Sequence, residues 1–259
     1  MKLRVVTATR GDSPFWSGAL ASLRNLPLDW EHVIVCPPDR ASSLAHSQAL
    51  VVPERGAGLY AALNQGWHAP GAWDALASLN DDDLLLTPGF GRACEELARR
   101  PDVEAVYGRV RLIGAGGENL GAQPVARRAE DIAALLGRGI VPLAQPGMVV
   151  RRSLLERLGG FDESYRLAGD LDFFVRALLA SARFLFVDAW VASFRLHAGQ
   201  LSKERAAIEA EIARALRPLA GVGGRAARWR FRLGNLGIYL DRVRRHGWVS
   251  MRELYDRTD

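Results

Sequence analysis

The chain of 259 residues is long enough for one large domain or two small ones, and its 49% apolar and 24% charged residues are ordinary for a globular protein. Its two cysteines, Cys36 and Cys94, lie far apart in the sequence, which argues against a disulfide framework or a zinc site. No run reaches the ~20 apolar residues of a transmembrane helix, and the N-terminus does not resemble a signal peptide. We therefore expect a cytoplasmic protein.

The net charge of +5 is unevenly distributed. Residues 1–221 carry 25 Lys/Arg and 25 Asp/Glu, whereas residues 222–259 carry 9 Arg and 4 Asp/Glu, so the final segment holds the whole excess. The neutral part lacks interleaved basic and aromatic residues, which argues against nucleic acid as a partner. The stretch LAGVGG, near residue 221, predicts a boundary between a main domain (residues 1–221) and a basic, amphipathic helical extension (residues 222–259).

Strand and helix patterns alternate through the first half of the chain. Short β-branched or apolar runs predict strands, and longer patterns that end at Gly or Pro predict helices. The strands are expected within residues 3–9, 32–38, 48–54, 73–80 and 103–113, and the helices within residues 15–24, 58–69 (closed by Gly66) and 88–101. This order indicates an α/β fold with a mostly parallel sheet flanked by helices, in which ligands bind beyond the carboxyl ends of the strands.

The second half begins with a Gly-rich loop or hairpin turn and continues with helices. The expected elements are a loop at residues 114–131, helices within residues 151–163, 168–181 and 203–219, and a pair of strands within residues 183–197. The first of these helices should stop at a Gly-Gly pair. The last should be an exposed amphipathic helix.

Three consecutive aspartates occupy the stretch LNDDDLLLTPGF, directly after a predicted strand. Carboxylates about 4 Å apart repel each other by roughly 1 kcal/mol in water, and by more where water is scarce. A solvated acidic turn tolerates this repulsion, and a divalent cation removes it, since Mg²⁺ and Mn²⁺ prefer oxygen ligands. These residues alone leave both interpretations open, with Asp82 or Asp83 as the candidate ligand.

Two further segments carry polar residues beside predicted elements. Asp170 lies at the start of the helix in LAGDLDFFVRAL, where an aspartate either caps the helix or acts as a general base. Asp172 and Arg176 have the spacing of an ordinary surface ion pair. His197 follows an aromatic strand and precedes Gly199, so it is either structural or in contact with a metal or phosphate.

Five segments, in order, resemble the family 2 glycosyltransferases with a GT-A fold, bacterial enzymes that use nucleotide-sugar donors. VVTATRG resembles the opening strand that contacts the nucleotide, GLYAALNQGW the GIYDAMNKG helix, and SLNDDDLL the Asp-x-Asp segment. QPGMVVRRSLLERLGGFDESYRLAGDLDFFVRAL resembles the acceptor-side segment that ends in the catalytic base, and FRLHAGQLS the closing strand and loop. Together they span about residues 3 to 202.

The resemblance implies roles for individual residues. Asp170 matches the base that deprotonates the acceptor hydroxyl. Asp82 matches the metal-binding aspartate, with Asp83 and His197 as further candidates to hold Mn²⁺ or Mg²⁺. Donor or nucleotide contacts are expected from Thr7, Thr9, Asp39, Glu54, Asn64, Asn80 and Asp81.

Several positions depart from the family pattern. Asp39 is displaced from the acidic position that follows the second strand in relatives, and Gly56 and Ala61 stand where relatives carry Asp. Gly169 replaces the usual Glu before the base, and Glu54 is a possible substitute for lost contacts. These changes put the identity of the nucleotide in doubt more than the class of reaction.

The resemblance implies an inverting, metal-dependent glycosyltransferase that moves a sugar from a nucleotide-diphosphate sugar to a hydroxyl of a glycan or lipid-linked acceptor, in cell-surface polysaccharide or glycolipid synthesis. The missing acidic residues keep a non-catalytic sugar-nucleotide binder open. A sugar nucleotidyltransferase is the other alternative, although TATRGDSPFW has only one Gly and one Arg where such enzymes carry a Gly-rich basic loop. The oligomeric state is left open.

The extension RAARWRFRLGNLGIYLDRVRRHGW mixes arginines with aromatic and aliphatic residues. Such a helix suits an anionic membrane surface, such as the inner face of a membrane that holds a lipid-linked acceptor. It also suits packing on the core or on another subunit. The number of apolar residues favours packing.

Overall fold

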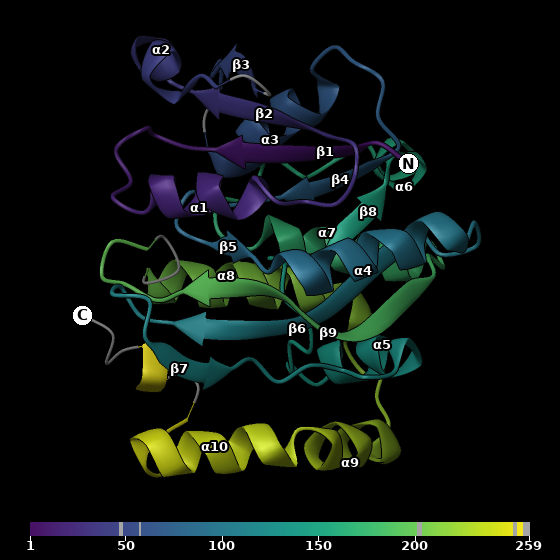
Figure 1. The fold of residues 1–259 in the computed structure, drawn as a ribbon. Helices are drawn as coiled ribbons and strands as arrows, with labels where there is room; N and C mark the ends of the chain where they lie inside the picture. The colour runs from purple at the N-terminus through teal and green to yellow at the C-terminus, as the bar shows by residue number, and fades with distance from the viewer. Residues whose placement is uncertain (47–48, 57, 201–203, 251–252, 256–259) are drawn as a thin grey trace.

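A computed structural model describes residues 1–46, 49–56, 58–200, 204–250 and 253–255. Figure 1 shows their arrangement. The strands are β1 (Leu3–Ala8), β2 (Trp30–Cys36), β3 (Ala49–Pro53), β4 (Ala75–Ser78), β5 (Leu84–Leu85), β6 (Ala105–Ile113), β7 (Asn119–Ala122), β8 (Val149–Arg151) and β9 (Phe184–Arg195). The helices are α1 (Trp16–Leu23), α2 (Ala41–Leu44), α3 (Leu59–His68), α4 (Thr87–Arg99), α5 (Ile132–Leu136), α6 (Arg152–Leu158), α7 (Gly169–Leu179), α8 (Arg205–Leu216), α9 (Arg225–Gly234) and α10 (Leu236–His246).

The described strands form one mixed sheet in the order β3-β2-β1-β4-β8-β6-β9-β5, with β7 paired to β6. Strands β3, β2, β1 and β4 are parallel neighbours. The short strand β8 runs antiparallel between β4 and β6, and β9 is parallel to β6. The predicted α/β class with helices on a largely parallel sheet is confirmed.

Each face of the sheet is covered by helices because successive strand residues point to opposite sides. On one face, Leu3 and Val5 of β1 pack with residues of α1 and α4. On the other, Val6 belongs to a core that also includes residues of α3, α5, α6, α7, α8 and α9. Helices α1 and α4 lie in front of the sheet in Figure 1, and α7 and α8 lie behind it.

Two sequence predictions differ from the structure in detail. The predicted strand pair at residues 183–197 is one strand, β9, which stays paired with β6 through two register shifts. Helix α3 continues past Gly66 to His68. A Cβ at Gly66 would come within 2.3 Å of Val6, so this glycine permits close contact between helix and sheet.

In the described part of the basic extension, helices α9 and α10 follow one another along the lower edge of the molecule in Figure 1. Asn235, buried between them, accepts a hydrogen bond from the backbone N–H of Val125 (3.0 Å) and donates one to its carbonyl (3.0 Å). Phe231 joins the main core, and Arg230 forms an ion pair with Asp131. One side of the extension therefore packs on the main domain.

Candidate active site

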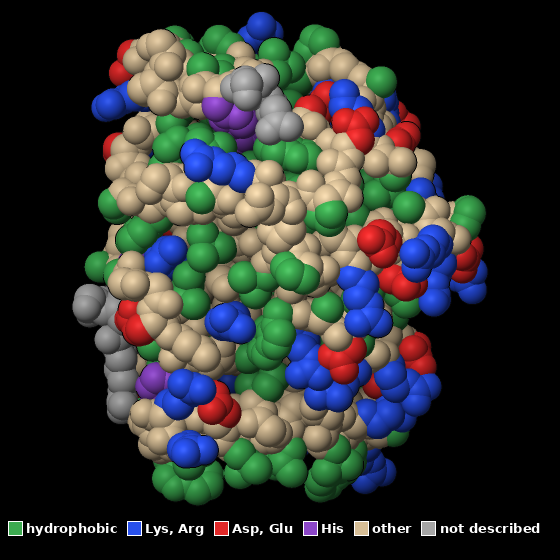
Figure 2. Space-filling model, in the orientation of Figure 1, with side chains coloured by type: hydrophobic (Ala, Val, Ile, Leu, Met, Phe, Trp, Pro, Cys, Tyr) green, Lys and Arg blue, Asp and Glu red, His purple; other side chains and the backbone are tan. Residues whose placement is uncertain are grey.

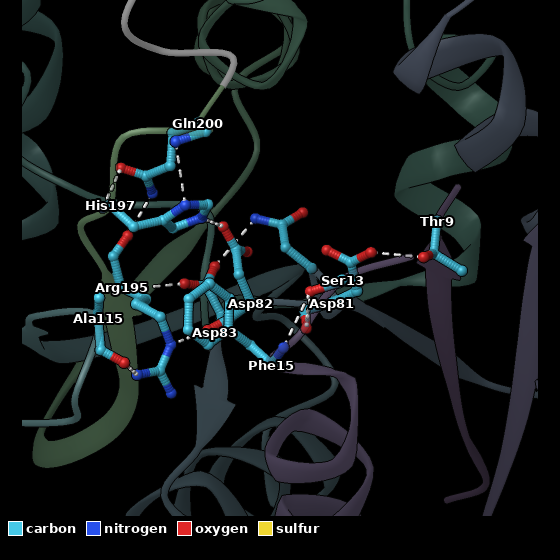
Figure 3. A network of polar contacts seen from close by, with 12 residues as sticks. Thr9, Ser13, Phe15, Asp81, Asp82, Asp83, Ala115, Arg195, His197 and Gln200 are labelled. Carbon is cyan, nitrogen blue, oxygen red and sulfur yellow. Dashed lines mark hydrogen bonds and ion pairs between the residues drawn. The ribbon is translucent and has the colours of Figure 1, made fainter. Parts of the chain in front are cut away.

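The three aspartates follow β4 at its carboxyl end, next to the end of β1, and point in three directions (Figure 3). Asp81 bonds to Thr9, Asp82 to His197, and Asp83 to the backbone of Arg195. Separate partners reduce the repulsion that one shared environment would impose. The aspartates are thus neither a simple solvated turn nor three equivalent ligands.

Asp81 lies between the ends of two parallel strands. The hydroxyl of Thr9, just after β1, donates a hydrogen bond to the Asp81 carboxylate, and the Ser13 hydroxyl donates one to the Asp81 carbonyl (3.2 Å). Burial raises the pKa of Asp81 and outweighs the opposing hydrogen bond from Thr9, while the charge of Asp82 adds to the rise. Two predicted donor-site residues, Thr9 and Asp81, are brought together here.

Asp82 and His197 form a pair from distant parts of the chain. Nε2 of His197, just after β9, lies 3.0 Å from an Asp82 carboxylate oxygen, and both side chains remain partly accessible. The Phe15 ring packs against the imidazole, with 4.8 Å between ring centroids. Among the described residues, no group of three or more His, Cys, Asp or Glu side chains is arranged to hold a metal by itself. An ion at this pair would need further ligands, such as water or oxygens of a bound molecule.

Asp83 has a different environment, which corrects its prediction as a metal ligand. It is buried, and its carboxylate accepts hydrogen bonds from the Arg195 backbone N–H (2.9 Å) and from the Asn80 side chain (2.9 Å). Burial, followed by the charge of Asp82, raises its pKa well above the ordinary value. Because both of its carboxylate oxygens accept hydrogen bonds in the interior, Asp83 has a structural role. Asn80 contacts it rather than an open site.

Arg195 is an important residue that the sequence predictions missed. Its buried guanidinium donates to the carbonyls of Asp82 (2.8 Å), Gly114 (3.0 Å) and Ala115 (3.1 Å), and lies over the Phe15 ring. It therefore fixes the backbone of the aspartate turn against the β6–β7 hairpin (Figure 3). An arginine between apolar residues in SFRLH was the only signal in the sequence.

Asp170 lies in the first turn of α7, which begins at Gly169, so it is not the residue that caps the helix. The Tyr60 hydroxyl donates a hydrogen bond to its carboxylate (3.2 Å). Burial raises the pKa of Asp170 and outweighs the hydrogen bonds from the Leu171 backbone and Tyr60. A Cβ at Gly169 would approach the Tyr60 ring to 2.8 Å, which explains why this position carries no side chain.

The position of Asp170 relative to the aspartates follows from the topology. The parallel strand β3 ends at Pro53, and α3 begins six residues later, so the first turn of α3 lies near the carboxyl ends of the parallel strands. Tyr60 belongs to that turn. Its hydrogen bond therefore holds Asp170 at the same edge of the sheet as Thr9 and Asp82.

The loop before α7 is held by Glu211 of α8. Its carboxylate accepts hydrogen bonds from the backbone N–H groups of Arg166 (3.0 Å), Leu167 (2.7 Å) and Ala168 (2.9 Å). Burial acts to raise the pKa of Glu211, but these bonds outweigh it and lower the pKa. This carboxylate restrains the segment that leads to Asp170.

Two predicted donor-binding residues are engaged elsewhere. Thr7 is buried in β1, and its hydroxyl lies 3.0 Å from Nε2 of the buried His32. Asn64 is buried in α3 and donates to the Phe161 carbonyl (2.8 Å) and Glu163 (2.8 Å), while its oxygen accepts from Phe161 N–H (2.9 Å) and Trp67 (3.0 Å). Both predictions are corrected, because neither side chain is available to a ligand.

The remaining predicted residues lie beyond the ends of β2 and β3. Asp39 is exposed and pairs with its neighbour Arg40 at 3.6 Å. Glu54 is half-buried, and its backbone N–H donates to the Cys36 carbonyl (2.8 Å). They share the sheet edge with the aspartates but contribute no described hydrogen bond to the network around Asp81 and Asp82.

Comparisons with known proteins identify the fold. No family model matches the chain, and no curated protein matches it. Among solved structures, residues 1–349 of S. aureus TarS in complex with UDP-GlcNAc are similar to this chain, with a TM-score of 0.63 and 16% identity. The alignment covers 98% of this chain and 77% of the TarS chain. A mannosyltransferase, PcManGT from Pyrobaculum calidifontis in complex with GDP-Man and Mn²⁺, is similar with a TM-score of 0.57 and 17% identity. That alignment also covers 98% of this chain and 77% of the other. The predicted GT-A fold is confirmed, and at this identity the likeness establishes the fold alone.

Proposed function

We propose that this protein is a glycosyltransferase that moves a sugar from a nucleotide-diphosphate sugar to an acceptor hydroxyl with inversion. Two observations carry the proposal: the Asp82–His197 pair beyond the carboxyl end of β4, and the half-buried Asp170, which Tyr60 holds beside the start of α3. The GT-A folds of the TarS complex with UDP-GlcNAc and of PcManGT with GDP-Man and Mn²⁺ support it.

The residues at the aspartate turn could hold a divalent cation together with the diphosphate of a bound donor. The Asp82 carboxylate and the His197 imidazole supply one oxygen and one nitrogen ligand, a combination that suits Mn²⁺ better than Mg²⁺. Asp81 can add a carboxylate nearby. When bound, the ion would supply positive charge that stabilises the diphosphate leaving group. His197 must present an unprotonated Nε2 to serve as a ligand, and it must then give up its hydrogen bond to Asp82.

On the acceptor side, Asp170 is suited to take the hydroxyl proton. Burial raises its pKa, so its carboxylate binds a proton more strongly than an exposed one. The Tyr60 hydroxyl donates a hydrogen bond to one carboxylate oxygen and so orients the group toward an acceptor. An oxygen freed of its proton attacks the anomeric carbon opposite the departing diphosphate, which inverts the configuration.

The donor and acceptor are proposed only by class. Asp39 and Glu54, beyond the ends of β2 and β3, are candidates to contact the nucleoside. The acceptor is a glycan or a lipid-linked sugar of cell-surface polysaccharide or glycolipid synthesis.

The test combines ligand binding with turnover. Thermal shifts are measured with UDP- and GDP-sugars, with and without Mn²⁺, for the wild type, Asp82→Ala, Asp170→Asn and the surface control Asp102→Asn. We expect Asp82→Ala to lose the Mn²⁺-dependent shift. Asp170→Asn should keep that shift but lose roughly 10²–10⁴-fold in nucleoside diphosphate release with a suitable acceptor.

Two outcomes would overturn parts of the proposal. Full turnover by Asp170→Asn removes the assigned base. A donor-dependent thermal shift in the wild type, without turnover of any donor, favours the non-catalytic binder that the absent acidic side chains at Gly56 and Ala61 suggest. Release of pyrophosphate from a nucleoside triphosphate would instead identify a nucleotidyltransferase.

A further inference from the structure

The outer side of α9 and α10 carries a row of exposed apolar side chains. Trp229, Leu233, Leu236 and Leu240 are 62%, 68%, 52% and 61% exposed. Their spacing of four, three and four residues keeps them on one side of the two successive helices. Trp248, beyond α10, is 92% exposed. These five residues are here called the apolar row, and Figure 2 shows hydrophobic side chains along the lower edge of the molecule, where α9 and α10 lie.

The apolar row is not needed for packing the extension onto the domain, because the opposite side does that. Ala227, Phe231, Asn235 and Arg242 are buried. Asn235 also holds the helices to Val125 through two hydrogen bonds. The predicted packing of the extension on the core thus involves one side of the helices, and the apolar row takes no part in it.

Unpaired arginines accompany the apolar row. Arg225, Arg228, Arg232 and Arg244 are exposed, and none forms an ion pair with a described residue. The acidic residue of α10, Asp241, already pairs with Arg245 (2.7 Å). The surface thus combines exposed apolar side chains with uncompensated positive charge.

The positive charge continues from α9 and α10 into a neighbouring pocket of the domain. A pocket of about 310 Å³ between α10 and the β6–β9 strands is lined by Arg109, Arg111, Arg127 and Arg245, among others. Arg109 pairs with Asp188 and Arg245 with Asp241, whereas Arg111 and Arg127 form no ion pair with a described residue. Anionic groups are favoured both on the helices and beside them.

We propose that α9 and α10 bind this protein to an anionic membrane surface, with the apolar row buried at the boundary between headgroups and acyl chains. Leucine and tryptophan suit that boundary, and the flanking arginines suit anionic lipids. Because the arginines of two copies would face each other without acidic partners, a second copy is the poorer occupant. No described helix is long and apolar enough to cross a membrane.

Through Asn235, membrane binding by the extension would also orient the candidate active site. Because Asn235 fixes the extension to the domain, membrane binding orients the whole α/β domain relative to the lipid surface. The inference that a lipid-linked acceptor is reached in this orientation rests on the proposed function, but the docking itself does not.

The test measures vesicle flotation of the full chain with phosphatidylcholine alone and with phosphatidylcholine plus phosphatidylglycerol. We expect binding only to the anionic vesicles, and weakening as salt rises. The double variant Leu233→Ser/Leu240→Ser should bind at least ~10-fold more weakly, because each removes apolar area from the lipid contact. The matched control, Leu50→Ser/Leu179→Ser, removes two exposed leucines elsewhere and should bind as the wild type does.

A second pair of variants tests the charge. Arg228→Gln/Arg232→Gln should lose roughly 10-fold in binding at low salt, whereas Arg24→Gln/Arg92→Gln should lose less. Unchanged thermal unfolding of all variants shows that they fold. The proposal is overturned if the wild type ignores anionic vesicles, if the leucine variant binds like its control, or if the leucine substitutions instead dissociate a dimer. None of these results depends on donor turnover, so failure here leaves the proposed function intact.

Discussion

At the scale of single residues, the three adjacent aspartates have three separate environments. Asp81 bonds to Thr9, Asp82 faces His197, and Asp83 is enclosed by Asn80 and the Arg195 backbone. Chemical identity therefore predicts little about the role of each. Burial and partner decide that only Asp82 and Asp81 are accessible to a ligand.

This difference predicts opposite behaviour for two neighbouring substitutions. Asp83→Ala leaves the buried N–H of Arg195 and the Asn80 amide without acceptors, so the free energy of unfolding should fall by roughly 2–4 kcal/mol. Asp82→Ala should cost much less stability but abolish the Mn²⁺-dependent shift with donor. Urea unfolding and thermal shift measure the two effects. Comparable stability losses in both variants would contradict the assignment of Asp83 as structural.

The half-buried carboxylate of Asp170 predicts a dependence of stability on pH. Burial raises its pKa in the folded protein above the ordinary value of 3.8, so the folded state holds the proton more tightly than the unfolded chain. Below that ordinary value the carboxyl is protonated in both states. As pH rises through the raised pKa, the ionised group lowers the stability of the fold.

Asp170→Asn should therefore unfold at a higher temperature than the wild type above the raised pKa, and the difference should vanish in acid. Unfolding temperatures measured across pH check this, with Asp102→Asn as the exposed control. A gain that is the same at every pH would show that the carboxylate charge is not its cause.

At the scale of elements, α3 connects the sheet to the acceptor side. Its first turn supplies Tyr60, which bonds to Asp170, and its middle supplies Asn64, which holds the segment at Phe161 between α6 and α7. Its last turn is bound by the buried Arg4 of β1, which donates to the carbonyls of Trp67 (3.0 Å) and Ala69 (2.6 Å). The helix therefore sets the position of α7 against the strands.

Asn64→Ala removes four hydrogen bonds and leaves the Phe161 N–H and carbonyl without that partner. We expect a loss of roughly 2–4 kcal/mol in the free energy of unfolding. Gln65→Ala in the next position is the matched control, since Gln65 makes one exposed hydrogen bond, to the Arg55 backbone. Denaturant unfolding distinguishes them. If Asn64→Ala instead kept full stability and only weakened donor affinity, the original donor-binding prediction would be correct.

At the scale of the whole molecule, the basic extension has two different sides. The inner side contributes Phe231 to the main core and the Arg230–Asp131 ion pair, and the outer side bears the apolar row. This argues for α9 and α10 as an integral part of the structure. The boundary at residue 221 then separates regions of different charge within it.

Removing residues 222–259 should lower the free energy of unfolding by more than about 3 kcal/mol, since a buried Phe alone contributes about that much. Leu233→Ser/Leu240→Ser, which changes only the outer side, should shift it by less than about 1 kcal/mol. Urea unfolding of both provides the comparison. A truncated chain as stable as the full one would mean that the extension is independent of the domain.

The sequence by itself determined the α/β class, the longer strands and helices in order, and the strand-end location of the aspartates, but not the short elements α2, β5, α5 and β8. The features it determined follow from local periodicity and from turn residues such as Gly159, where α6 ends as predicted. It could not assign Thr7, Asn64 and Asp83, because their partners His32, Phe161 and Arg195 lie 25, 97 and 112 residues away. Only the tertiary structure decided which polar side chains are consumed by such contacts and which apolar residues of the extension stay exposed, since burial is a property of the packed chain.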